Sequence, residues 1–168
     1  MWGTRHTGAA GSAHANSVLN SSLRQSPKVL RFTVSSMQKH LFTGKRILVV
    51  DDETAVVHTL NLIFRSRGFE VRAAKSAEEA LEKVAGWRPD IAVLDVVLPG
   101  MNGLDFAVLL AQQAPSCRIV HLSGQPRSSE LREQAALEGH PFEILAKPMH
   151  PEVLLAHLAS LLEPSAPA

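Results

Sequence analysis

The feature that most constrains the fold is an apolar run that ends in three acids, Ile47-Leu48-Val49-Val50-Asp51-Asp52-Glu53. Four consecutive apolar residues, three of them β-branched, are typical of a strand that is buried on both faces of a parallel sheet. The acids follow at the carboxyl end of this strand, where open α/β sheets place their ligand crevice. Two carboxylates about 4 Å apart repel each other by roughly 4 kcal/mol near a protein surface. The pair therefore requires a proton, a lysine or a divalent cation, unless one Asp only caps the next helix.

From Lys45 onward, short apolar runs alternate with segments of helical periodicity. Connections this short predict a parallel sheet with helices on both faces. Ser76 and Glu79 predict a capping box, in which Ser76 accepts a hydrogen bond from the first helical turn and Glu79 reaches back. The expected strands cover 47–50, 69–74, 91–95, 118–122 and 142–146, and the expected helices cover 54–67, 76–86, 104–113, 128–138 and 151–162.

The composition is that of a globular domain with a tail. The chain has 168 residues, of which 45% are hydrophobic and 20% charged, and its formal net charge is +1. This charge balance points to neither nucleic acid nor membrane, and no apolar run is long enough to span a bilayer. The single cysteine, Cys117, excludes an internal disulfide and fits a reducing compartment. We therefore expect a cytoplasmic protein. The eight histidines are scattered without metal-ligand spacing, so we expect them to be solvated or satisfied within the core.

Residues 1–44 differ in character from the rest of the chain. They contain no Asp or Glu, are rich in small polar residues, and show no sustained periodicity. This composition predicts a disordered N-terminal arm, and Met37 is an alternative start of translation. We expect the folded domain to cover residues 45–163, with a short tail at 164–168.

Polar side chains follow four of the expected strands. Asp51 and Asp52 end the first strand, Asp95 the third, Ser123 the fourth and Lys147 the fifth. Because the carboxyl ends of parallel strands meet at the same edge of a sheet, we expect one crevice to collect three carboxylates, a hydroxyl and an ammonium. Chance places any one of these residues at a strand end, but the five together are a far more specific signal.

These residues and their neighbours closely resemble the receiver domain of two-component response regulators, over about residues 45–163. The resemblance implies a doubly wound, flavodoxin-like fold of the chemotaxis-regulator type with strand order 2-1-3-4-5. It rests on Val-Asp-Asp-Glu at 50–53, Leu-Asp-Val-Val-Leu-Pro-Gly-Met-Asn-Gly at 94–103, Leu-Ser-Gly at 122–124 and Lys-Pro at 147–148.

The resemblance also implies a magnesium site. Its ligands would be the carboxylates of Asp52, Asp95 and, through a water molecule, Asp51, together with the backbone carbonyl of Val97. A backbone ligand explains how an apolar residue can belong to a metal site. Oxygen ligands of this kind suit a hard divalent cation, which neutralises the clustered acids.

By the same resemblance, Asp95 is the phosphoryl acceptor. A carboxylate can attack phosphorus when the negative charges around it are neutralised. Lys147 would pair first with Asp95 and then with a phosphoryl oxygen, since its ammonium is a compact point charge. The hydroxyl of Ser123 would bind another phosphoryl oxygen, and Gly124 would leave room for the group to approach.

The implied function is that of a phosphoacceptor, which is not an enzyme in the usual sense. Its phosphodonor would be a sensor histidine kinase or a histidine phosphotransfer protein, and its output would pass through contact with a downstream protein. We expect neither direct DNA binding nor a membrane association. The implied output surface, which can also join two copies as a homodimer, consists of the fourth helix, the fifth strand and the fifth helix, expected at 128–138, 142–146 and 151–162.

One residue departs from the family pattern. A Tyr or Phe usually stands three residues before the lysine and moves inward on activation, but this chain has Ile144 there and contains no Tyr. A binding-only pseudo-receiver is therefore an alternative. A small aspartate-nucleophile phosphatase is another, although such enzymes carry Asp-x-Asp at the first strand and a cap, whereas Asp51 and Asp52 are adjacent. In the family, the side chains at Val97 and Gln125 influence how long the phosphoryl group lasts.

Overall fold

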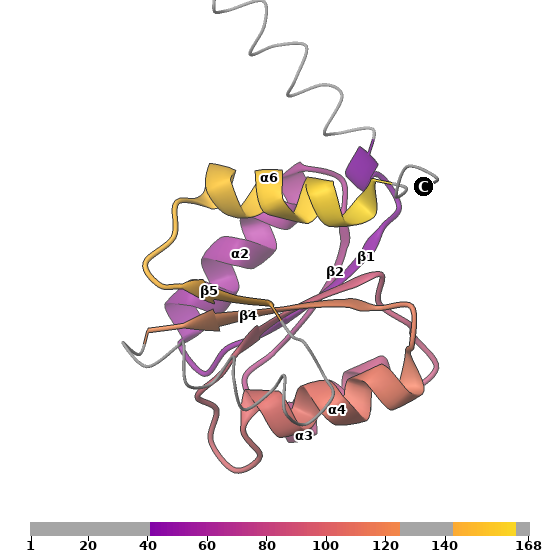
Figure 1. Cartoon of the computed structure of the whole chain (residues 1–168), viewed down its shortest axis with the longest axis vertical. Coiled ribbons are helices and arrows are strands. Elements are labelled where there is room, and N and C mark those ends of the chain that lie inside the picture. Colours follow the sequence, from indigo (N-terminus) through magenta and orange to yellow (C-terminus); the bar gives the residue numbers. More distant parts are fainter. Residues whose placement is uncertain (1–40, 125–142, 164–168) are drawn as a thin grey trace, which may run out of the picture. The chain divides into compact units, whose positions relative to one another are not determined.

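The computed structural model describes residues 41–124 and 143–163, and these form a five-stranded parallel sheet with helices on both faces (Figure 1). The strand order is β2-β1-β3-β4-β5, which confirms the predicted fold class and topology. Several expected features lie outside the described residues: the helix at 128–138, Phe142, Met37, Gln125, most of the arm, and the tail. The elements are β1 (Arg46–Val50), α2 (Thr54–Ser66), β2 (Glu70–Ala74), α3 (Ala77–Val84), β3 (Ile91–Asp95), α4 (Gly103–Gln113), β4 (Arg118–Ser123), β5 (Glu143–Ala146) and α6 (Pro151–Leu162).

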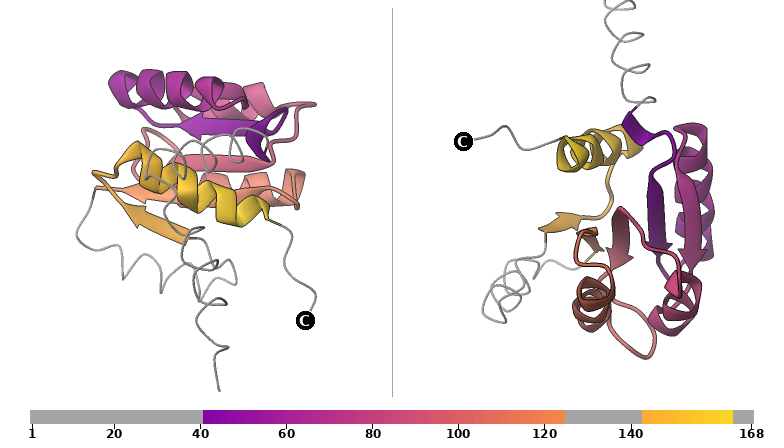
Figure 2. Two further views of the ribbon diagram at one scale, coloured as in Figure 1. Left: turned by 90° about the horizontal axis from the view of Figure 1, so that it is seen from above. Right: turned by 90° about the vertical axis from the view of Figure 1, so that its right-hand side faces the viewer.

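The apolar residues of β1 are divided between the two faces of the sheet. Ile47 and Val49 pack into the core beneath α2 and α6, whereas Leu48 and Val50 pack into the core against α3 and α4. All four are at most 1% exposed. Both faces are buried because each carries a layer of helices, with α2 toward the β1 side of its face and α6 toward the β5 side (Figure 2). This explains why the strand is apolar throughout rather than alternating.

The strand register brings the expected site residues to one edge. Val50 of β1 pairs with Leu94 of β3, so the next residues along the two strands, Asp51 and Asp95, lie side by side. Asp95 pairs in turn with Leu122 of β4. One residue beyond the last pair of β4 and β5, the N–H of Lys147 donates to the carbonyl of Ser123 at 2.8 Å. The parallel ladders therefore deliver side chains from β1, β3, β4 and β5 to a common edge.

Residues that precede the expected domain start belong to the packed structure. Phe42 is fully buried and its ring stacks on Phe69, with the ring centroids 4.5 Å apart. Phe69 also meets the ring of Phe64 edge-on at 5.6 Å. The N–H of Gly44 donates to the carbonyl of Gly68, which adopts a positive φ of 97° at the end of α2. The core thus extends to Leu41, four residues before the start expected at Lys45.

Of the two hydrogen bonds of the capping box predicted for α3, one is confirmed and the other involves a neighbouring N–H. Ser76 accepts from the N–H of Glu79 at 3.2 Å, as expected. The carboxylate of Glu79 accepts from the N–H of Lys75 at 2.7 Å, one residue earlier than the Ser76 N–H of the standard motif. Within the part of the chain that is described, every helix is too short or too polar to cross a membrane.

We predict that Phe64→Ala lowers the free energy of unfolding by about 3–5 kcal/mol, because it empties a fully buried position next to Phe69. Leu62→Ala on the same helix is the matched control, since Leu62 is 58% exposed and its truncation should change stability by less than about 1 kcal/mol. Urea unfolding followed by circular dichroism measures both. Equal losses in the two variants would contradict the assigned core.

Candidate functional site

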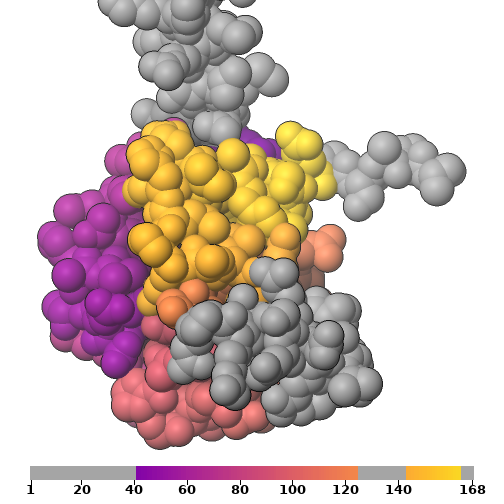
Figure 3. Space-filling view, turned by 60° about the vertical axis from the view of Figure 1, so that its left-hand side comes forward, coloured from indigo at the N-terminus to yellow at the C-terminus, as the bar shows by residue number. Residues whose placement is uncertain are grey.

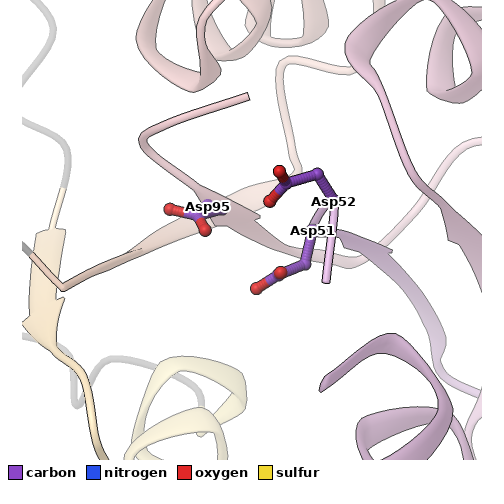
Figure 4. A group of neighbouring side chains, drawn as sticks. All are labelled: Asp51, Asp52 and Asp95. Carbon is purple, nitrogen blue, oxygen red and sulfur yellow. The ribbon is translucent and has the colours of Figure 1, made fainter. Parts of the chain in front are cut away.

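Three carboxylates meet at the carboxyl edge of the sheet. Asp51 follows β1, Asp52 comes next, and Asp95 is the last residue of β3 (Figure 4). Each offers an oxygen within 4.8 Å of an oxygen from the others. Asp51 is 2% exposed and Asp95 is 7% exposed, whereas Asp52 faces solvent. The site therefore has two buried acids and one acid open to the surface.

The ammonium of Lys147 joins the two buried acids. Its Nζ donates to Oδ2 of Asp51 at 2.6 Å and to Oδ2 of Asp95 at 2.7 Å, and Glu53 lies at 4.0 Å. The other oxygen of each buried acid accepts from the backbone: Asp51 from the N–H of Glu53 at 3.0 Å, and Asp95 from the N–H of Val97 at 3.1 Å. Both carboxylates are thus held at both oxygens.

The acids are not serving as helix caps. The residue that precedes α2 is Glu53, and among the described residues its side chain makes no capping hydrogen bond. The side chain of Asp51 instead accepts from Glu53 N–H, which is outside the helix. The interpretation of the acidic pair as a simple helix cap is therefore wrong.

Burial alone would lower the pKa of Lys147, but its hydrogen bonds and charge interactions with Asp51 and Asp95 outweigh this and raise the pKa above its ordinary value. Lys147 therefore carries its positive charge at any physiological pH. Three formal carboxylate charges face this one ammonium, so the cluster retains two formal negative charges. All the donor atoms are oxygens, and a cluster of this composition and charge fits a hard divalent cation such as Mg²⁺.

Ser123 and Ile144 occupy the neighbouring strands. Ser123 ends β4 and is 1% exposed, and a Cβ built on the next residue, Gly124, meets no atom of the described residues within 4 Å. Ile144 is 1% exposed and pairs in register with His121 of β4. The position at which the family usually carries an aromatic residue is therefore filled by a buried aliphatic side chain.

The α4 helix begins in close contact with Asp95, the last residue of β3. A Cβ built on Gly103 would lie 1.9 Å from the backbone oxygen of Asp95, a distance that no side chain tolerates. The N–H of Gly103 donates to the carbonyl of Val96 at 3.0 Å, and Asn102 caps the helix by accepting from the N–H of Asp105 at 2.8 Å. Glycine is required here by this close approach, and not by an unusual φ.

His121 is a site neighbour that the sequence analysis did not single out. Its ring is fully buried, and Nε2 lies 3.2 Å from the carbonyl oxygen of Gly103. Burial lowers the pKa of His121 to about 4, although the Gly103 carbonyl and the charge of Asp95 act in the opposite direction. The ring is therefore neutral near pH 7. The sequence does point to this role, because His121 stands in the apolar run Ile119-Val120-His121-Leu122, and a histidine inside a buried strand needs an internal hydrogen-bond partner.

Residues 47–159 match the family described as the response regulator receiver domain, and the chain belongs to this family. It therefore contains a receiver domain of the two-component type. Among curated proteins, it is 36% identical to the response regulator MprA of Mycolicibacterium vanbaalenii over 122 residues, which are 73% of this chain and 52% of that protein. The chain spans about half the length of the curated relatives it matches.

Two solved structures of response regulators are similar to this chain. A CheY-like receiver domain from Methanospirillum hungatei is 28% identical with a TM-score of 0.63, and the match covers 72% of this chain and 95% of that chain. A response regulator from Burkholderia pseudomallei, described with a phosphorylated aspartic acid, a calcium ion and citrate, is 32% identical with a TM-score of 0.61 and a coverage of 69% of both chains.

We predict that stability falls between about pH 6.5 and pH 4 because of His121. In this window the unfolded chain binds a proton on this residue while the folded chain does not, so the free energy of unfolding decreases by up to about 3 kcal/mol as the pH drops. Urea unfolding at several pH values gives the free energy of unfolding as a function of pH. Between pH 6.5 and pH 4, this free energy should change less steeply with pH in His121→Leu than in wild type. His58→Leu, at an exposed position of α2, should keep the wild-type slope, and an unchanged slope in His121→Leu would refute the assignment.

Proposed function

We propose that this chain accepts a phosphoryl group on Asp95 from the phosphohistidine of a sensor kinase or a histidine phosphotransfer protein, and that its output passes through contact with another protein. The observation that carries the proposal is the contact of Lys147 with both Asp51 and Asp95, beside a third carboxylate. The similarity to a response regulator described with a phosphorylated aspartic acid supports it. Since such exchanges take place where kinase domains and ATP are found, we assign the chain to the cytoplasm.

In the transfer step, a carboxylate oxygen of Asp95 forms a bond to phosphorus while the bond from phosphorus to the donor imidazole nitrogen breaks. The electron pair of the broken bond stays on that nitrogen, and the product is an acyl phosphate on Asp95. The Lys147 ammonium, already 2.7 Å from Asp95, would bind an oxygen of the incoming group, and the Ser123 hydroxyl would donate to another. The phosphoryl group adds up to about two negative charges and three acceptor oxygens.

A magnesium ion would be held by the carboxylates of Asp51, Asp52 and Asp95 and by the backbone carbonyl of Val97. When bound, the ion neutralises the clustered acids and the phosphoryl oxygens. The protein residues fix the ligand positions: backbone N–H groups orient Asp51 and Asp95, while exposed Asp52 completes the set from the solvent side.

We also propose where the phosphodonor binds. A groove of about 600 Å³ runs from Lys147 and Glu53 along α2 and the segment that joins β5 to α6. Figure 3 shows the face on which α2 (purple) meets this segment (orange to yellow). The groove is largely apolar, so it suits the apolar side of a helix that carries the donor histidine next to the site. Its lining includes Val56, Thr59, Leu60, Met149, Pro151 and Leu154.

For the output, we propose the surface of β5 and α6, which can contact a downstream protein or a second copy of the chain; the third expected part of this surface, residues 128–138, lies outside the described residues. A binding-only pseudo-receiver is the second candidate, because Ile144 replaces the usual aromatic residue. The two candidates differ in whether Asp95 becomes phosphorylated.

The first experiment is intact-mass measurement of the full chain after incubation with acetyl phosphate, with and without Mg²⁺. We expect a Mg²⁺-dependent gain of one phosphoryl group in wild type and none in Asp95→Asn, which replaces the nucleophilic oxygen but keeps the shape. Asp105→Asn, at an exposed position of α4, is the control and should be labelled like wild type. A phosphorylated Asp95→Asn protein would place the acceptor elsewhere, and a folded wild type without labelling would favour the pseudo-receiver.

For the groove, we predict that Thr59→Arg slows phosphorylation by a histidine kinase at least about tenfold, because it puts a bulky charge into an apolar contact. Labelling by acetyl phosphate, which needs no docking partner, should stay unchanged. The donor is any purified kinase found to label the wild type. His58→Arg adds the same side chain one residue away, outside the groove lining, and should behave like wild type. Equal effects of the two variants, or equal loss with both donors, would contradict the docking site.

A further inference from the structure

His121 is a buried titratable residue beside the site that the proposed chemistry does not use. It lies in the middle of β4, paired with Leu94 of β3 and Ile144 of β5, and is fully buried. Side chains alternate along a strand, so His121 shares its face with Ile119 and Ser123. Ile119 packs against the core formed with α3 and α4, which places the imidazole on the α4 side of the sheet.

The ring makes a directional contact with the start of α4. Its Nε2 lies 3.2 Å from the carbonyl oxygen of Gly103, the first residue of that helix. A carbonyl oxygen only accepts, so Nε2 carries the proton and donates. This hydrogen bond joins the centre of β4, two residues before Ser123, to the N-terminus of α4.

Gly103 is also held by residues at the end of β3. Its Cα is so close to Asp95 that an added Cβ would lie 1.9 Å from the Asp95 carbonyl oxygen. Its N–H donates to the carbonyl of Val96, whose own N–H donates to the carbonyl of Leu122 at 3.1 Å. Residues 97–102 therefore form a loop with both ends fixed at the same place, and His121 secures the end at Gly103.

We infer that His121 is a positioning residue for the cation site, which acts through Gly103 on the loop that begins at Val97. The inference rests on the proposed function, because it concerns the metal ligands proposed there. Val97 enters this loop with its N–H bound to Oδ1 of Asp95 and its carbonyl proposed as a ligand. When the Nε2–H donor is lost, the bond from Gly103 to Val96 remains, but the start of α4 is no longer tied to β4 by this hydrogen bond. The loop that carries the Val97 carbonyl is then held less firmly beside Asp95.

The test is the Mg²⁺ affinity of the full chain, measured by titration calorimetry for wild type, His121→Leu and His121→Gln. Leucine fills the space without a donor, whereas the glutamine amide N–H can reach the Gly103 carbonyl. We expect His121→Leu to bind Mg²⁺ about tenfold more weakly than wild type. This is the lower end of the range of affinity losses found when a residue that orients a metal ligand is removed. His121→Gln should stay within about twofold of wild type, as should the control Ile119→Val, which alters packing on the same face of β4 without touching the hydrogen bond.

The outcomes separate this inference from the proposed function. A wild type that binds no Mg²⁺ defeats both, whereas equal Mg²⁺ affinity of wild type and His121→Leu overturns only the role of His121. Equal weakening in His121→Leu and His121→Gln also overturns it, because ring shape rather than the donor would then matter. If His121→Leu does not fold, the ring nitrogens of wild type decide by NMR: a neutral ring protonated at Nε2 supports the inference, and a proton on Nδ1 alone refutes it.

Discussion

The arrangement at the carboxyl edge depends on one cation held between two acids. The register of β1 and β3 places Asp51 beside Asp95, so the backbone forces the two carboxylates together whatever they cost electrostatically. Lys147 offsets this repulsion. It directly follows β5, which is two places beyond β3 in the strand order. A long, flexible side chain with a compact charge is suited to reach from there to both acids. The parallel topology and the ion pairs are therefore parts of one constraint.

The backbone removes most of the freedom that this cluster would otherwise have. Each buried carboxylate accepts a backbone N–H at the oxygen that Lys147 does not contact, so rotation of either acid would break a hydrogen bond. The loop after Asp95 is closed by the bond from Gly103 to Val96, and Gly103 approaches the Asp95 carbonyl too closely for any side chain. The acids thus keep their positions through main-chain contacts, and the surface-exposed Asp52 is the member of the cluster that is open to solvent.

The sequence was informative wherever burial acts on a whole segment. The apolar runs of β1 and β3 identified central strands because both their faces are covered, and the shared edge of parallel strands then brought Asp51, Asp95 and Lys147 together. The roles of single side chains were harder to predict. Phe42 precedes any periodic pattern, and only its stacking on Phe69 reveals that it belongs to the core. The partner of His121 is a carbonyl 18 residues away, and no local pattern predicts such a contact.

Charge balance also constrains the order of events at the proposed site. With Lys147 in place, three carboxylates leave two formal negative charges, and the phosphoryl group would bring up to about two more into a cluster where two of the acids are buried. Such an excess is strongly unfavourable away from bulk water. A divalent cation held by Asp51, Asp52 and Asp95 would cancel the existing excess, so we expect the proposed transfer to depend on its presence. The ammonium of Lys147, which now neutralises Asp51 and Asp95 together, would then be available to the phosphoryl oxygens of the proposed product.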